Sequence, residues 1–246
     1  MLRAALAALL ALGAMAPAAE LKVLSVGSIN PGLSNNGEQF RKDTGNQITI
    51  QVDTAPGLSR RLGAGETADI LIATADVLDD AAKTGKILAG SRMVVARVGV
   101  GVTVRQAGTI PNVKTADGLK QALESADSIV YNEGSSGLYL DKLFAQMGIG
   151  EKLKAKTTRY PNGGQVAQHV VSGKGNEIAF LPISYIISNA STGLQYVGPL
   201  PGDTQNYTVY EAAVMTGSKS PDASRDFIKY LTTAPARKIF SVSGVD

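Results

Sequence analysis

Apolar residues recur along this chain in two patterns, as short unbroken runs and as longer stretches in which they return every three or four positions. The short runs are typical of buried strands and the longer stretches of amphipathic helices. The first third of the chain repeats the two patterns in turn, with expected strand–helix pairs at 21–27 and 32–43, 47–52 and 58–63, and 69–73 and 76–84. This order predicts an α/β fold with a parallel sheet and helices on both faces.

Two β-type stretches are long, at 92–104 and 206–215, and the first is too long for a typical strand. We interpret them as extended crossings between two lobes. Between the crossings we expect a second α/β series, with strands at 128–131, 157–160, 177–181 and 194–197 and helices at 115–125, 138–147, 165–172 and 184–189. Helices are also expected after the second crossing, at 222–231 and 235–240.

The crossings divide the predicted fold into one lobe of residues 20–96 and 207–246 and a second lobe of residues 97–206. We expect each lobe to be a mainly parallel sheet flanked by helices, with the two crossings forming a hinge. A cleft between such lobes, at the carboxyl ends of strands, is where small ligands bind.

The amino terminus has the features of an export signal. Arg3 provides a positive charge, residues 4–15 are almost wholly apolar, and Ala16-Pro17-Ala18 places small residues around a cleavage site. The apolar run is too short to span a bilayer comfortably. We therefore predict a signal peptide over residues 1–19 and a periplasmic protein that is soluble after its removal.

Composition excludes several classes of function. The net charge is only +3, the 24 Lys and Arg residues are scattered, and aromatic residues make up 5% with no Trp, so nucleic-acid and polysaccharide binding are disfavoured. Cysteine is absent and there is one His, which argues against disulfides, a thiol nucleophile or an imidazole-rich metal site. We expect no metal and no cofactor, and because nothing indicates oligomerisation, we expect a monomer.

Four strand-to-helix junctions, at 27–30, 53–57, 134–137 and 161–165, are rich in Gly, Ser, Thr and Asn. Helix N-termini leave unpaired N–H groups that suit an anion, although N-capping alone favours the same residue types. The doubled glycine at 163–164 and the Gly-Ser-Ser-Gly run go beyond capping and would allow close approach to a ligand. The candidate hydroxyl donors are Ser28, Thr54, Ser135 and Ser136.

Other side chains could contribute to the same site. Arg60, Arg61 and Arg159 could each bind a carboxylate, but solvated positions on a helix and at a strand end explain them more simply. Tyr160 and Tyr185 fall near the predicted cleft.

Several segments resemble the periplasmic molybdate-binding proteins, which are type II solute-binding proteins of ABC importers. The most specific is Gly63–Ala73, and the others are Leu21–Ser28, Ile178–Phe180, Phe227–Leu231 and Ala236–Phe240. The resemblance spans nearly the whole chain after the signal peptide. It implies the two-lobed type II fold and capture of a small anion for the membrane subunits of an ABC importer.

In that family, hydroxyl and N–H groups at helix starts hold a tetrahedral oxyanion. The resemblance places the matching positions at Ser28, Ala55 beside Thr54, Ser136 and Gly164, and the ligand tyrosine near Pro182, one turn from Tyr185. Because Ala55 and Pro182 replace two side-chain donors, an organic polycarboxylate fits as well as molybdate. The predicted ligand-binding residues are Ser28, Thr54, Ala55, Ser135, Ser136, Gly163, Gly164 and Tyr185.

The chain also resembles a divergent branch of this family that includes aconitate isomerase. Such a reaction moves a double bond in a tricarboxylate and needs a base and an acid. Glu133 and His169 are the only plausible pair in this sequence, although a lone His on an apolar helix face is more often structural. We favour a non-enzymatic anion-binding protein and keep the isomerase as the alternative.

Overall fold

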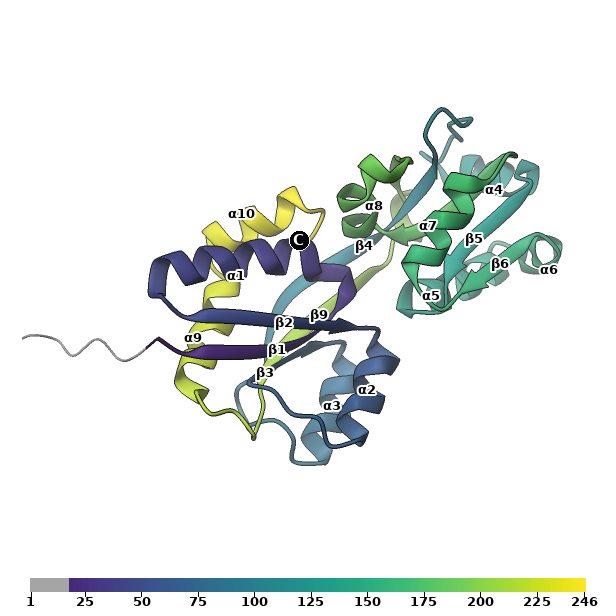
Figure 1. Cartoon of the computed structure of the whole chain (residues 1–246). Helices are drawn as coiled ribbons and strands as arrows, with labels where there is room; N and C mark the ends of the chain where they lie inside the picture. The colour runs from purple at the N-terminus through teal and green to yellow at the C-terminus, as the bar shows by residue number, and fades with distance from the viewer. Residues whose placement is uncertain (1–17) are drawn as a thin grey trace, which may run out of the picture.

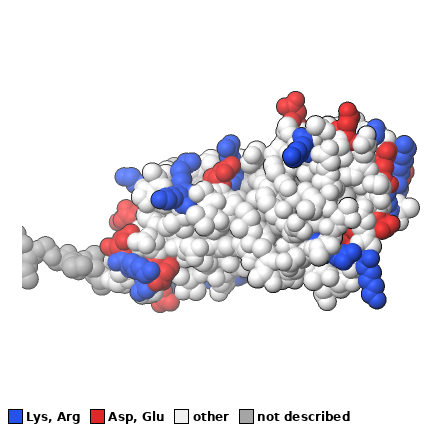
Figure 2. All heavy atoms as spheres, turned by 90° about the horizontal axis from the view of Figure 1, so that it is seen from above, with Lys and Arg blue, Asp and Glu red and all other residues white. Residues whose placement is uncertain are grey.

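The computed structural model describes residues 18–246. The predicted signal peptide lies almost entirely outside these residues and stays a prediction. Within them a nine-stranded sheet has the order β2-β1-β3-β9-β4-β7-β5-β6, with β8 paired to β4. Figure 1 shows an elongated molecule in which helices gather around each end of this sheet. Basic and acidic side chains are interspersed on the face shown in Figure 2.

The three predicted strand–helix pairs near the amino terminus are confirmed. Strands β1, β2 and β3 are parallel, and each is followed by a helix. Helices α1, α9 and α10 pack together on one side of this part of the sheet, and α2 and α3 cover the other (Figure 1). The bounds are β1 Glu20–Val26, α1 Asn30–Thr44, β2 Gln47–Asp53, α2 Ala55–Gly63, β3 Ile70–Ala73, α3 Ala75–Lys83, α9 Pro221–Leu231 and α10 Ala234–Val242.

The two long strands are also confirmed, as β4 (Met93–Arg105) and β9 (Tyr207–Val214). Residues 93–99 of β4 pair with β9, while residues 100–105 pair with β7 and β8, all antiparallel. Strand β9 is in turn antiparallel to β3. Each part of the sheet is therefore a set of three parallel strands completed by antiparallel ones, and β4 joins the two parts.

The second α/β series has the predicted order. Strands β5, β6 and β7 are parallel, and Figure 1 shows α4 to α8 around them. The bounds are α4 Ala116–Ser125, β5 Ser128–Asn132, α5 Ser135–Gln146, α6 Gly150–Lys154, β6 Thr157–Tyr160, α7 Gly163–Ser172, β7 Glu177–Pro182, α8 Ile183–Ser188 and β8 Leu194–Pro199, with 3-10 turns η1 Gly27–Ile29, η2 Ala190–Thr192 and η3 Gly202–Thr204.

Helices α2, α5 and α7 begin two or three residues earlier than expected, and the five-residue α6 was not expected. Apolar periodicity marks a helix only where it faces the core, whereas Pro, Ser and Gly fill the first turns here. Proline fits that turn because its missing N–H has no partner there. Ser135, Ser136, Gly163 and Gly164 therefore lie in first helical turns, while Thr54 and Asn162 are the N-caps that precede α2 and α7.

The apolar cores fall into two parts. One core takes residues between 21 and 98 and between 210 and 245, and two smaller clusters take residues between 100 and 200. We call the corresponding parts the first and the second lobe, while the predicted boundaries at 96/97 and 206/207 stay predictions. None of the helices within residues 18–246 is long and apolar enough to cross a membrane.

Gly101 marks the place where α8 lies against β4. A Cβ atom here would come within 2.7 Å of Cδ1 of Ile186 and 3.1 Å of side-chain atoms of Ile183 and Tyr196. The glycine therefore permits a close helix–strand contact where β4 passes from one lobe to the other.

We expect Gly101→Ala to lower the free energy of unfolding by about 1–3 kcal/mol, because the methyl group overpacks this contact. Gly63→Ala is the matched control, since a Cβ at Gly63 meets no atom within 4 Å, and it should be neutral or raise stability by up to ~1 kcal/mol. Urea unfolding measures both, and equal midpoints for the two variants would contradict this account of Gly101.

Candidate functional site

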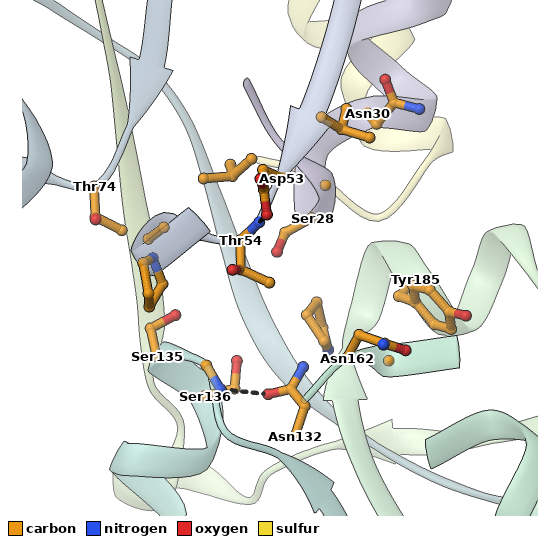
Figure 3. Close-up of a pocket in the computed structure, with 18 of the residues that line it drawn as sticks. Ser28, Asn30, Asp53, Thr54, Thr74, Asn132, Ser135, Ser136, Asn162 and Tyr185 are labelled. Carbon is orange, nitrogen blue, oxygen red and sulfur yellow. Dashed lines mark hydrogen bonds between the residues drawn. The ribbon is translucent and has the colours of Figure 1, made fainter. Parts of the chain in front are cut away.

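A cavity of about 430 Å³ lies between the two lobes. The first lobe lines it with residues from 26–30 and 52–56 and with Thr74, the second with Asn132, 134–136, 162–164, Pro182 and Tyr185, and β9 with Tyr210. Figure 3 shows Ser28, Asp53, Thr54 and Thr74 on one side, facing Asn132, Ser135, Ser136 and Asn162 on the other. The volume is in the range of roughly 300–1,000 Å³ that is typical of small-molecule sites.

Six strand-to-helix junctions of the described chain meet at this cavity, those before α1, α2, α3, α5, α7 and α8. Their N-terminal N–H groups and helix dipoles favour a negative charge. All eight residues predicted to bind a ligand line the cavity: Ser28, Thr54, Ala55, Ser135, Ser136, Gly163, Gly164 and Tyr185. The structure thus brings them together, while their contact with a ligand stays a prediction.

On the first-lobe side, the start of α2 satisfies much of its own polarity. Thr54 is the N-cap, and its Oγ1 accepts a hydrogen bond from the Gly57 N–H at 3.2 Å. The Thr54 N–H donates to Oδ1 of Asp53 at 2.7 Å. Ala55 is the first residue of the helix and adds only a methyl group. The N–H groups of Thr54 and Gly57 are therefore already used, while the hydrogen of the Thr54 hydroxyl can still be donated to a ligand.

On the second-lobe side, Ser136 is 8% exposed, and its hydroxyl makes no hydrogen bond within residues 18–246. The Ser135 hydroxyl lies 3.3 Å from Oγ1 of Thr208. A Cβ at Gly137 would fall 1.8 Å from the carbonyl oxygen of Asn132. The interpretation of the Gly-Ser-Ser-Gly run therefore needs correction, because Gly137 allows α5 to approach its own preceding strand rather than a ligand.

The start of α7 lies against Tyr185. The Asn162 side chain caps the helix by accepting from the Gln165 N–H at 3.1 Å. A Cβ at Gly163 would lie 3.3 Å from the Tyr185 ring, and one at Gly164 would lie 3.7 Å from its hydroxyl. Burial raises the pKa of Tyr185, so its phenol stays neutral at physiological pH and can donate a hydrogen bond.

Besides Tyr185, three polar residues of the cavity lie outside the four predicted junctions, namely Thr74, Asn132 and Tyr210. Thr74 follows β3 and is the N-cap of α3, yet its buried Oγ1 has no hydrogen-bond partner within the described chain. Its place after a strand and before a helix could have revealed it. Tyr210 is 3% exposed, and burial raises the pKa of its phenol, while the nearby hydroxyl groups of Ser28, Thr208 and Ser135 oppose that shift. No sequence signal marks Tyr210, because its position follows from strand register.

The arginines considered for the site lie outside it. Nε of Arg61 is 2.6 Å from Oε2 of Glu66, and this contact, with help from Lys22, lowers the pKa of Glu66 to about 2. Arg159 pairs with Asp141 at 3.1 Å, and Arg60 is exposed away from the cavity. These positions support the simpler interpretation, in which the three arginines do not belong to the binding site.

Glu133 and His169 do not line the cavity. Nδ1 of His169 lies 3.0 Å from the Tyr160 hydroxyl and Nε2 lies 3.3 Å from the Ser128 hydroxyl, so the ring links α7 to two strands of the second lobe. Glu133 is exposed, and its N–H donates to the Tyr160 carbonyl at 2.9 Å. The structure therefore does not support the proposed acid–base pair. Residues 18–246 contain no group of three or more His, Asp or Glu side chains arranged to hold a metal ion.

Comparison with known proteins identifies the family of this chain. Residues 21–246 match the model of the bacterial extracellular solute-binding proteins. The chain belongs to this family. Among curated proteins it is similar to an aconitate isomerase of Pseudomonas sp., with 30% identity over 235 residues that cover 93% of this chain and 88% of that protein.

Solved structures with a similar fold include two proteins whose names refer to molybdate or molybdenum. One is the Azotobacter vinelandii periplasmic molybdate-binding protein, with a TM-score of 0.74, 19% identity and coverage of 92% of this chain and 98% of that one. The other is the substrate-binding domain of a putative molybdenum ABC transporter from Clostridium difficile, with a TM-score of 0.74, 18% identity and coverage of 93% and 99%. These likenesses confirm the two-lobed periplasmic-binding-protein fold.

Two threonines at equivalent helix starts should respond in opposite ways to replacement by the isosteric valine. Thr74→Val removes a buried hydroxyl that has no partner, so we expect it to raise the free energy of unfolding by about 1 kcal/mol. Thr54→Val removes the cap of α2 and should lower it by about 1 kcal/mol. Urea unfolding of the free protein measures both effects. A loss of stability in Thr74→Val as large as that in Thr54→Val would show that the Thr74 hydroxyl is satisfied.

Proposed function

We propose that this protein captures a small anion in the cavity between its lobes and delivers it to the membrane subunits of an ABC importer. The observation that carries the proposal is the meeting of six helix starts, from both lobes, at one cavity lined with hydroxyl groups. The predicted export signal and the family support a periplasmic location for this activity. Movement about the shared strand β4 would close the lobes on the ligand.

The affinity would come mainly from hydrogen bonds. The starts of α1, α3, α5 and α7, four helices of nine or more residues, add roughly 0.3–1 kcal/mol each, or about 1–4 kcal/mol together. Micromolar binding needs about 8 kcal/mol. Two or three charge-assisted hydrogen bonds of roughly 1.5–3 kcal/mol each would supply the difference. Ser28, Ser136 and Tyr185 are the side chains that we assign to this role.

The cavity has room for an organic acid as well as for an inorganic oxyanion. A tetrahedral oxyanion has five heavy atoms and takes up roughly the space of a few water molecules, at about 30 Å³ each. A cavity of about 430 Å³ leaves most of its volume unfilled around such an ion. A dicarboxylate or tricarboxylate would reach hydroxyl groups on both lobes at once.

A thermal-shift panel tests the proposal. Purified protein is heated with molybdate, tungstate, sulfate, phosphate and a series of di- and tricarboxylates. A ligand present at 100 times its Kd adds about 2.7 kcal/mol, which should raise Tm by roughly 5–10 °C for a chain of this size. Ser136→Ala should weaken binding by roughly 10-fold or more, and Ser172→Ala, outside the cavity, should not. If no anion in the panel raises Tm, the protein does not have this function.

The similarity to aconitate isomerase favours a second candidate, an isomerase of an unsaturated tricarboxylate. Glu133 and His169 lie outside the cavity, so another pair of groups would have to move the proton. Proton NMR of trans-aconitate with the protein in deuterated buffer separates the two candidates. We expect stoichiometric binding without exchange. Conversion of the substrate, or exchange of its carbon-bound protons, would instead establish catalysis.

A further inference from the structure

Asp53 is the one residue lining the cavity whose side chain carries a full charge, as judged over the described chain. The remaining lining residues are small, apolar, hydroxyl-bearing or amide-bearing, and no Lys, Arg or His is among them. A site that otherwise offers donors to an anion thus contains a carboxylate, which accepts hydrogen bonds and repels negative charge.

The position of this carboxylate is built into the start of α2. Asp53 ends β2, and its Oδ1 accepts the Thr54 N–H at 2.7 Å. A Cβ at Gly57 would fall 1.9 Å from Oδ1 and 2.6 Å from Oδ2, so only glycine leaves room for the side chain. The carboxylate therefore packs on the first turn of α2, where the helix dipole favours a negative charge. Figure 3 shows it beside Ser28 and Thr54.

Two consequences follow for a ligand. The start of α2 already holds an anion, so the ionised group of a ligand is better placed at the starts of α5 and α7, where no acidic side chain lines the cavity. Within residues 18–246, Oδ2 of Asp53 accepts no hydrogen bond, so a ligand that offers a hydrogen there gains a charge-assisted contact. A ligand without that hydrogen leaves the carboxylate unpaired when the lobes close over it.

We propose that the ligand is an organic acid that also carries a hydrogen-bond donor, a hydroxyl or protonated carboxyl group, and that Asp53 accepts this hydrogen. The ionised carboxylate of the ligand lies at Ser135, Ser136, Gly163 and Gly164. The site selects by rejection as well as by attraction, because fully ionised groups such as those of molybdate and sulfate have no hydrogen for Asp53. This inference rests on the proposed function and names the ligand class of the same cavity.

Paired ligands that differ by one donor test the inference. Isothermal titration compares malate with succinate, citrate with tricarballylate, and phosphate with sulfate, each pair sharing its overall shape. The wild-type protein should bind the donor-bearing member of at least one pair about tenfold more tightly, with the other member never preferred. This comparison needs no variant and is decisive even if substitutions at Asp53 unfold the protein.

The variant Asp53→Asn tests the role of the carboxylate directly. The Thr54 N–H requires an acceptor, so the amide oxygen should take the place of Oδ1 and the NH₂ group should take the place of Oδ2. A donor then faces the ligand, and the preference within the pairs should disappear or reverse, with sulfate binding about tenfold more tightly than to the wild type. Asp76→Asn is the matched control, because Asp76 is exposed in the first turn of α3 and does not line the cavity.

The outcomes separate this inference from the proposed function. If anions bind but the wild type does not discriminate within the pairs, or binds molybdate or sulfate most tightly, the role of Asp53 is refuted and the proposed function stands. The same holds if Asp53→Asn folds and keeps the wild-type preference. If no anion of any pair and no molybdate binds, both proposals fail.

Discussion

The site depends on one constraint, the common direction of the parallel strands on either side of β4. Across the described chain, β1, β2 and β3 in the first lobe and β5, β6 and β7 in the second are all followed by residues that line the cavity. Antiparallel pairing of β4 with β9 and with β7 sets how these two groups of strands face each other. Each helix that follows such a strand then starts at the cavity.

The strand–helix order and the lobe architecture could be predicted because each depends on local apolar patterns that a linear sequence displays. The predicted positions of the helix starts were less accurate, because Pro56, Ser135 and Gly163 occupy first turns that carry no apolar signal. Tyr210 and the role of Asp53 could not be predicted at all. The first depends on the register of β9 against β4, and the second on the space that Gly57 leaves for a carboxylate.

The junctions look alike in sequence, but they differ in how much hydrogen-bonding capacity they leave free. Thr54, Asn162 and Asn132 accept N–H groups of their own segments, and so use part of that capacity within the protein. Ser136 and Thr74 make no such bond within residues 18–246. Residue type alone does not distinguish these two groups, because Ser, Thr and Asn serve equally as caps and as ligand donors. Only the three-dimensional structure distinguishes the side chains that cap their own helix from those that are free to bind a ligand.

The absence of Lys and Arg from the cavity lining in residues 18–246 implies how the site achieves selectivity. A basic side chain attracts any anion over a long range, whereas N–H and hydroxyl donors act only over hydrogen-bonding distances. The geometry of those donors therefore has to do most of the discrimination. Tyr210 lies between the two sides, because its phenol is close to the hydroxyl groups of Ser28 in the first lobe and Ser135 in the second. The relative position of the lobes thus fixes the spacing of the donors, and with it the shape of the ligand that fits.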